Sequence, residues 1–321
     1  MKEVSPRMNK SKRVTEGAIL TAIFIVILAS TFIPLLSMIT IFLLPVPLVI
    51  FTYRHGWKPA LVMAMASFFV AFIFTNIVAI PLTLPAIIGG IVIGDAVHKK
   101  RSAYETWAQG TAGLAVALVI GLLFTQLVFD INFSSEIDQQ MNNMIGQFED
   151  VVKQLDMGEE MTEQLLLLRE QIDLVKNLIP LAIVMGSLIH AFISQWASYK
   201  VINRLEQEKF HFPPFRNLAF PTAILWVYLI SMLLALTQPD PEGMFYVVVQ
   251  NIMLLASILI LIQGVSFIFY YLHIKKLSPA LSVIGLVLAL FFAPIVFPLL
   301  RILGIIDIGF KLRERLSNSE K

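Results

Sequence analysis

The sequence contains no cysteine and little charge. Of its 321 residues only 14% are charged, whereas 57% are hydrophobic. The absence of cysteine excludes disulfides, thiolate metal sites and thiol catalysis. Because a soluble domain of this size carries about 25% charged residues, the shortage of charge indicates a chain that lies in lipid.

Several catalytic signatures are also absent. The sequence has no His-Glu-x-x-His zinc motif, no glycine-rich phosphate loop ending in Lys-Ser or Lys-Thr, and no Gly-x-Ser-x-Gly elbow. Its basic residues lie in short loops and not on one face, which argues against a nucleic-acid partner. We therefore expect no enzyme: no catalytic residues, no metal, no cofactor and no ATPase activity of its own.

Long apolar runs fill most of the chain. A transmembrane helix needs about 20 mostly apolar residues. The candidate spans are 15–33, 35–52, 59–80, 81–97, 107–129, 177–199, 218–237, 244–272 and two short halves of 279–310. The sequence thus predicts an all-α, polytopic transmembrane helix bundle of about nine or ten spans.

Prolines predict where two of these runs are interrupted. Pro45 and Pro47 should bend or loosen the second span, because proline removes a backbone donor. Pro294 and Pro298 should divide the last run near Ala293 for the same reason. A long span plus an interfacial helix is the alternative for this last run.

Lysine and arginine predict the orientation, because they are in excess in cytoplasmic loops. With the N-terminus in the cytoplasm, the inner loops are the basic or mixed segments 54–58, 98–101, 200–216 and 273–276. The outer connections, near Pro34, near Pro81 and at 238–243, contain no lysine or arginine. We expect a multi-pass protein of the cell membrane with both termini in the cytoplasm.

One acidic segment does not fit the bilayer. Residues 131–176 contain Lys153, Arg169 and Lys176 as their only basic residues among many acidic ones, and their apolar residues alternate in steps of three and four. This spacing predicts an extracytoplasmic hairpin of two amphipathic helices that break at Met157-Gly158. The hairpin is either a solvated spacer or a lid or docking element.

The spans and the acidic segment divide the chain into five parts. These are a basic cytoplasmic tail (1–14), an N-terminal bundle of five spans (15–130), the hairpin (131–176), a C-terminal bundle (177–310) and a second basic cytoplasmic tail (311–321).

Polar side chains inside spans usually face a bundle interior or a cavity. The span 177–199 contains Ser187, His190, Ser194 and Ser198 on one stripe, with Gln195 beside it. His190 and Gln195, with Asn251 from a later span, are the candidate substrate-binding residues. Alternatively, these side chains join helices by hydrogen bonds. Arg301 and Asp307 in the last span either pair with each other or lie near an interface.

A stripe of small residues begins the first span. In GAILTAIF, Ala18 and Ala22 lie four apart and so on one side of a helix. Small residues permit close backbone approach in lipid, so these alanines either dock a partner protein or pack within the chain. Gly90 and Gly94 form a similar pair.

Two resemblances follow from these stretches. The segment TEGAILTAIF with LLPVPLVIFTYRHGWKPAL resembles the start of S-components, the substrate-binding subunits of energy-coupling-factor vitamin transporters. In that family an Ala-x-x-x-Ala stripe on the first helix packs against a transmembrane coupling subunit, and Ala18 and Ala22 match it. The same early residues, with HGWKPALV, GGIVIGD and LGIIDIGFKLRER, resemble the YybS-like family of uncharacterised bacterial multi-pass membrane proteins.

The first resemblance implies a small-solute-binding membrane subunit that works with a coupling subunit and ATPases. S-components have six spans and are shorter than this chain, which carries no vitamin-binding motif of that family. The alternative is a membrane scaffold that binds other proteins and transports no solute. In both cases the lipid bilayer is the surrounding partner.

Overall fold

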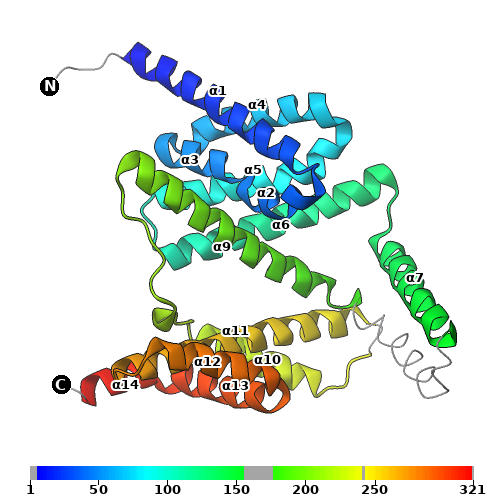
Figure 1. The fold of residues 1–321 in the computed structure, drawn as a ribbon, viewed down its shortest axis with the longest axis vertical. Coiled ribbons are helices and arrows are strands. Elements are labelled where there is room, and N and C mark those ends of the chain that lie inside the picture. Colours follow the sequence, from blue (N-terminus) through cyan, green and yellow to red (C-terminus); the bar gives the residue numbers. More distant parts are fainter. Residues whose placement is uncertain (1–5, 155–175, 241–242, 320–321) are drawn as a thin grey trace. The chain divides into compact units, whose positions relative to one another are not determined.

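The fold is that of a computed structural model, which describes residues 6–154, 176–240 and 243–319. These residues form helices joined by short connections, and no strand occurs among them. The chain divides into two compact units, residues 1–212 and 213–321. The predicted all-α bundle is therefore confirmed (Figure 1).

The first unit contains the longer series of helices. They are α1 (Pro6–Ser30), α2 (Pro34–Leu43), α3 (Val46–His55), α4 (Trp57–Thr75), the short 3₁₀ helix η1 (Asn76–Val78), α5 (Ala79–His98), α6 (Ala103–Phe129), α7 (Phe133–Gln154) and α9 (Ile179–Glu206). Helix α5 lies centrally, packed against α3, α4 and α6.

The second unit is smaller. It consists of the 3₁₀ helix η2 (Phe215–Asn217), α10 (Ala223–Ala235), α11 (Met244–Ile274), α12 (Pro279–Phe291), α13 (Ala293–Phe310) and α14 (Leu312–Ser319). Helix α11 packs against α10, α12 and α13.

Seven apolar segments of the described chain are long enough to cross a membrane. One of them, Trp57–His98, has 42 residues and contains both α4 and α5, which pack against each other. Helices α10 and α12 occur where spans are predicted, but each has only 13 residues. The multi-pass architecture is confirmed, whereas two of the ten predicted spans are too short for a full crossing by a straight helix.

Both predicted proline interruptions are present. Helix α2 ends at Leu43 and α3 begins at Val46, with Pro45 as its N-terminal cap residue. Helix α12 ends at Phe291 and α13 begins at Ala293, so the last run is two helices. The run is thus divided as predicted, but only α13 is long enough to cross a membrane.

The predicted division of the chain differs from the structure at α9. The prediction assigned this helix to a C-terminal bundle beginning at residue 177, but α9 packs against α2, α3, α5 and α6 of the first unit. The reason is local: α9 carries the small buried side chains Ser187, Ala191, Ser194 and Ser198, which allow it to lie close to the earlier helices.

The acidic segment is helical in its described half. Helix α7 covers Phe133–Gln154 and exposes Met144, Phe148 and Val151 on its surface. Lys176 forms an ion pair with Asp138 at 2.7 Å. The predicted break at Met157-Gly158 and the second helix of the hairpin lie outside the described residues.

Glycines set the closest helix contacts in the first unit. A Cβ atom on Gly90 would lie 2.9 Å from the Pro45 carbonyl oxygen, and one on Gly94 would lie 2.8 Å from that of Val49. Helix α5 thus approaches α3 backbone to backbone, and the predicted small-residue pair is an internal packing contact.

Candidate functional site

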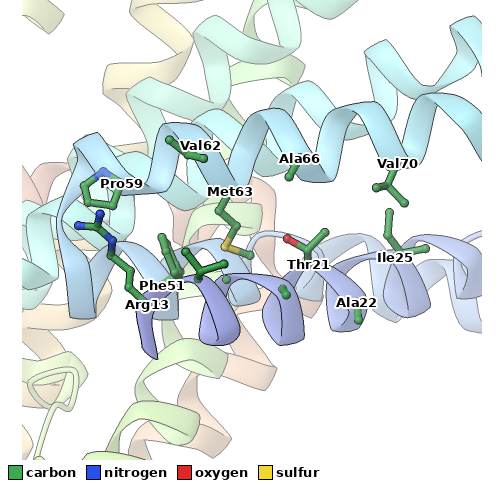
Figure 2. A pocket seen from close by; sticks show the side chains of 13 residues that line it. Arg13, Thr21, Ala22, Ile25, Phe51, Pro59, Val62, Met63, Ala66 and Val70 are labelled. Carbon is green, nitrogen blue, oxygen red and sulfur yellow. The ribbon is translucent and has the colours of Figure 1, made fainter. Parts of the chain in front are cut away.

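A groove lies between α1 and α4. Its volume is about 650 Å³ and it is partly open. Figure 2 shows the two helices as its walls, with Arg13 beside Pro59 at one end and Ile25 beside Val70 at the other. Phe51 of α3 and Met63 of α4 also line it. The groove is almost wholly apolar, with Arg13 as its one charged lining residue.

Small residues make this hollow. Gly17, Ala18 and Ala22 of α1 and Ala66 of α4 all line the groove and leave space that larger side chains would fill. Leu20, Phe24 and Leu28 lie on a neighbouring side of α1 and are buried in the unit. The helix is therefore held by its large residues and presents its small ones to the groove.

Ala18 and Ala22 are exposed. They line the groove that α1 forms with α4 of the same chain, and larger side chains do not cover them. Docking of a partner protein on them stays a prediction, and the groove is the surface where it would occur.

Charged side chains of the first unit gather at the end where Arg13 lies. Glu16 of α1 contacts His55, with 2.7 Å between Oε2 and Nε2, and also Arg54. Arg54 Nε donates a hydrogen bond of 2.8 Å to Glu206 at the end of α9. These contacts join α1, at Glu16, to the C-terminal ends of α3 and α9 at one side of the unit, which we call the basic end.

Glu208 extends this network. Its Oε1 accepts hydrogen bonds from Lys100 Nζ and from the Tyr53 hydroxyl, each at 3.0 Å. The bond from Lys100, and then that from Tyr53, lowers the pKa of the Glu208 carboxyl below its ordinary value of 4.5.

His190 and Gln195 are both buried on α9, among the helices of the first unit. The imidazole of His190 lies edge-on to Phe42 of α2 with 5.2 Å between ring centroids, and its Nε2 has no hydrogen-bond partner among the described residues. Gln195 Nε2 donates to the Ala103 carbonyl oxygen and to the Tyr199 hydroxyl. Gln195 thus joins α9 to the start of α6.

Asn251 belongs to the second unit. Its Nδ2 donates a hydrogen bond of 2.7 Å to the carbonyl oxygen of Val247, one turn earlier on α11. The three candidate substrate-binding residues therefore fall into two places: His190 and Gln195 on α9, and Asn251 on α11. Their role in binding a solute stays a prediction.

A polar cluster in the second unit escaped the sequence analysis. Asp307 of α13 is 4% exposed. It accepts hydrogen bonds from Gln263 of α11 and from Arg313 Nε, the latter at 2.9 Å. Arg313 also donates to the Arg216 carbonyl oxygen and to the Ser266 hydroxyl. The sequence did contain a signal for this cluster: Arg313 follows the last span closely and can fold back onto Asp307, a carboxylate near the end of that span.

Arg301 and Asp307 do not pair. Six residues apart on a helix, they point in directions about 120° apart. Arg301 instead donates a hydrogen bond of 3.1 Å to the Ser257 hydroxyl of α11.

Comparison with known proteins assigns the chain to a family. The family model described as "Predicted membrane protein (DUF2232)" matches residues 19–308. The chain belongs to the DUF2232 family. One relative, described as uncharacterized protein YybS of Bacillus subtilis (strain 168), is 30% identical over 310 residues, which are 96% of this chain and 100% of the relative. No solved structure matches the chain.

The predicted YybS-like membership is confirmed. With its several span-length apolar helices, this DUF2232 protein is an integral membrane protein. The resemblance to S-components stays a prediction.

Proposed function

We propose that this DUF2232 protein is a small-solute-binding subunit of the bacterial plasma membrane that resembles an S-component and has no ATPase of its own. A transmembrane coupling subunit docks on the groove face of α1 and recruits the ATPases. The exposure of Ala18 and Ala22 in the groove is the observation that carries this proposal. Helices in lipid associate through close packing at such small residues and not through hydrophobic driving force.

The make-up of the first unit supports the proposal. Its described apolar segments are α1, the broken pair α2–α3, α4, α5, α6 and α9, which is six, the number that the resemblance implies for an S-component. The acidic segment containing α7 is an insertion between the fifth and the sixth of them.

The basic end supports a cytoplasmic N-terminus. Basic residues from four places in the chain lie at or next to this end: Arg13, Arg54, Lys100 and Lys209. Because such residues are retained on the cytoplasmic side, the basic end faces the cytoplasm and α7 faces outward.

Cysteine labelling tests this orientation cleanly, because the natural chain has no cysteine. Gln147→Cys should react with a membrane-impermeant maleimide added to intact cells, and Lys209→Cys should react only after permeabilisation. The reverse pattern would invert the topology and remove the basis of the proposal.

Affinity purification from native membranes tests the docking. The wild type should retain a transmembrane protein together with ATPase subunits, and Ala18→Trp with Ala22→Trp should lose them while the monomer stays folded. Ile23→Trp is the matched control, since Ile23 is also exposed on α1 but does not line the groove. Retention of the same partners by the double variant would contradict the docking.

The solute would contact His190, whose buried Nε2 lacks a partner among the described residues. A thermal-shift screen with vitamins tests this: a ligand at 100 times its Kd adds about 2.7 kcal/mol to the free energy of unfolding. His190→Ala should abolish the shift. A shift that persists in this variant would remove His190 from the site.

A membrane scaffold without a solute is the second candidate. It is favoured by Gln195 and Asn251, whose amide groups already donate to atoms of the protein itself. A stable protein complex with no ligand-induced shift would support the scaffold over the solute-binding subunit.

A further inference from the structure

We propose that the groove between α1 and α4 binds one anionic phospholipid, with the headgroup phosphate at Arg13 and an acyl chain along the groove. This inference goes beyond the proposed function and does not depend on it: the lipid would occupy the groove in the protein alone, when no coupling subunit is docked on the same face of α1.

The length of the groove fits one leaflet. Ile25 follows Arg13 by twelve residues and Val70 follows Pro59 by eleven. At 1.5 Å per residue the groove is therefore about 17 Å long. Half of a hydrocarbon core of about 30 Å is 15 Å. A chain that starts at the headgroup level beside Arg13 would thus run along the groove to about the middle of the membrane.

The lining suits an acyl chain. Apart from Arg13 and Thr21, its side chains are apolar, and Gly17 and the alanines keep the walls low. The Thr21 hydroxyl is 3.4 Å from the Ser67 hydroxyl, so this polar group has a partner within the protein. A cavity without free polar groups favours hydrocarbon over a polar solute.

The charge at the end of the groove suits a phosphate. Among the described residues no carboxylate pairs with Arg13, and the nearby Glu16 is engaged by His55 and Arg54. An arginine fork matches phosphate oxygens in geometry. Lys12 is exposed beside Arg13 in the sequence, and Lys58, next to Pro59, lies over the ring of the exposed Trp57.

These basic and aromatic residues mark the level of the headgroups. Tryptophan is enriched at the membrane interface, and basic residues there attract anionic lipids. The groove therefore combines apolar walls with a cationic end at the interface. This arrangement is complementary to an anionic amphiphile, which has an apolar chain and a negatively charged headgroup.

Native mass spectrometry of the delipidated full-length protein in detergent tests the inference. The probes are dioleoyl-phosphatidylglycerol, dioleoyl-phosphatidylcholine and inorganic phosphate. The wild type should retain one phosphatidylglycerol in preference to phosphatidylcholine and should retain no inorganic phosphate. Arg13→Gln should lower the affinity for phosphatidylglycerol about fivefold, as expected for one basic residue at the interface, and leave phosphatidylcholine unchanged.

Two further variants separate the groove from the general surface. Ala22→Phe should fill the groove and abolish retention of both lipids, and it should fold because Ala22 is exposed. Lys200→Gln should change nothing, since Lys200 is an exposed cation outside the groove.

Equal retention of the two lipids by the wild type, or unchanged retention in Ala22→Phe, would overturn the inference. Binding of inorganic phosphate alone would assign Arg13 to a free anion and not to a lipid. Co-purification of a transmembrane protein that Ala22→Phe removes without altering lipid retention would assign the groove to that protein and likewise overturn the lipid site.

Discussion

The second unit contains a buried ion pair, whereas the ion pairs at the basic end of the first unit are partly exposed. In the first unit the carboxylates Glu16, Glu206 and Glu208 meet their basic partners at the basic end, where the paired side chains are between 22% and 61% exposed. In the second unit Asp307 is paired with Arg313 while their side chains are 2% and 15% exposed. If one partner is removed, water can solvate the other at the basic end but cannot reach it at the Asp307–Arg313 pair. Loss of a partner should therefore cost more stability in the second unit.

The units resemble each other in their use of glycine. Gly90 and Gly94 let α5 approach α3, and Gly264 and Gly304 let α11 approach α13. A Cβ atom on Gly264 would collide with the Leu300 carbonyl oxygen, and one on Gly304 with that of Ile260. Because apolar surface gains nothing by leaving lipid for protein, close backbone packing must supply much of the attraction in both units.

The largest expected effect comes from the crossing of α11 and α13. Gly264→Leu should separate these helices and unfold the second unit, because overpacking costs about 1–3 kcal/mol where side chains can adjust, and more where backbone blocks them. The loss should appear as a fall in the temperature of unfolding in detergent. Gly285→Leu is the control, since nothing lies within 4 Å of a Cβ atom there. An equal fall in the unfolding temperature for both variants would contradict the prediction that close packing at Gly264 stabilises the contact between α11 and α13.

The buried ion pair comes next. Asp307→Asn should destabilise the protein by about 3–5 kcal/mol, because Arg313 would keep its charge without a carboxylate. Denaturant unfolding would measure this, with Lys99→Gln as the exposed counterpart in the first unit. The pair Lys99–Asp95 should be worth at most about 1 kcal/mol. A cost for Asp307→Asn no larger than that would remove the contrast between the units.

Helix caps give a smaller difference. Ser102 accepts a hydrogen bond from the Glu105 backbone, and the Glu105 carboxylate accepts one from the Ser102 backbone, which together cap α6. Ser102→Ala should cost about 1 kcal/mol of unfolding free energy. Thr222→Ala at the cap of α10 should cost less, since Thr222 makes no capping hydrogen bond. Chemical denaturation of the two variants side by side measures both, and a larger cost at Thr222 would contradict the prediction.

The smallest effect concerns pH at the basic end. The lowered pKa of Glu208 means that its contribution to stability is present above its ordinary value of 4.5 and is lost as the pH falls through the lower pKa of the folded protein. Unfolding temperatures measured between about pH 6 and pH 3 should therefore fall less steeply in Lys100→Gln than in the wild type. Parallel curves would show that the Lys100 contact does not hold the carboxyl in its charged form.

Local chemistry made much of the fold predictable. Proline has no backbone donor, and this predicted the helix breaks beside Pro45 and Ala293. The lengths of the apolar runs predicted the bounds of most helices to within a few residues. The candidate site was harder to predict from the sequence. Helical spacing placed Ala18 and Ala22 on one stripe, but it could not show that α4 would form the opposite wall of a groove.

The polar side chains show the same limit. Spacing placed His190 and Gln195 on one helix, yet only their neighbours decide that Gln195 binds Ala103 while the Nε2 of His190 stays without a partner in the described chain. The pair Asp307–Arg313 was missed because it depends on a turn after α13 that folds Arg313 back toward α11.

The sequence by itself determined that this chain lies in a membrane as a series of helices, because lipid offers no water to backbone groups and a helix satisfies them within one segment. Only the tertiary structure decided that α9 joins the first unit, that Asp307 meets Arg313, and that the small face of α1 is left open. Those outcomes depend on which helices pack together. The helical periodicity of 3.6 residues shows which residues share a face of a helix, but it does not show which other helix packs against that face.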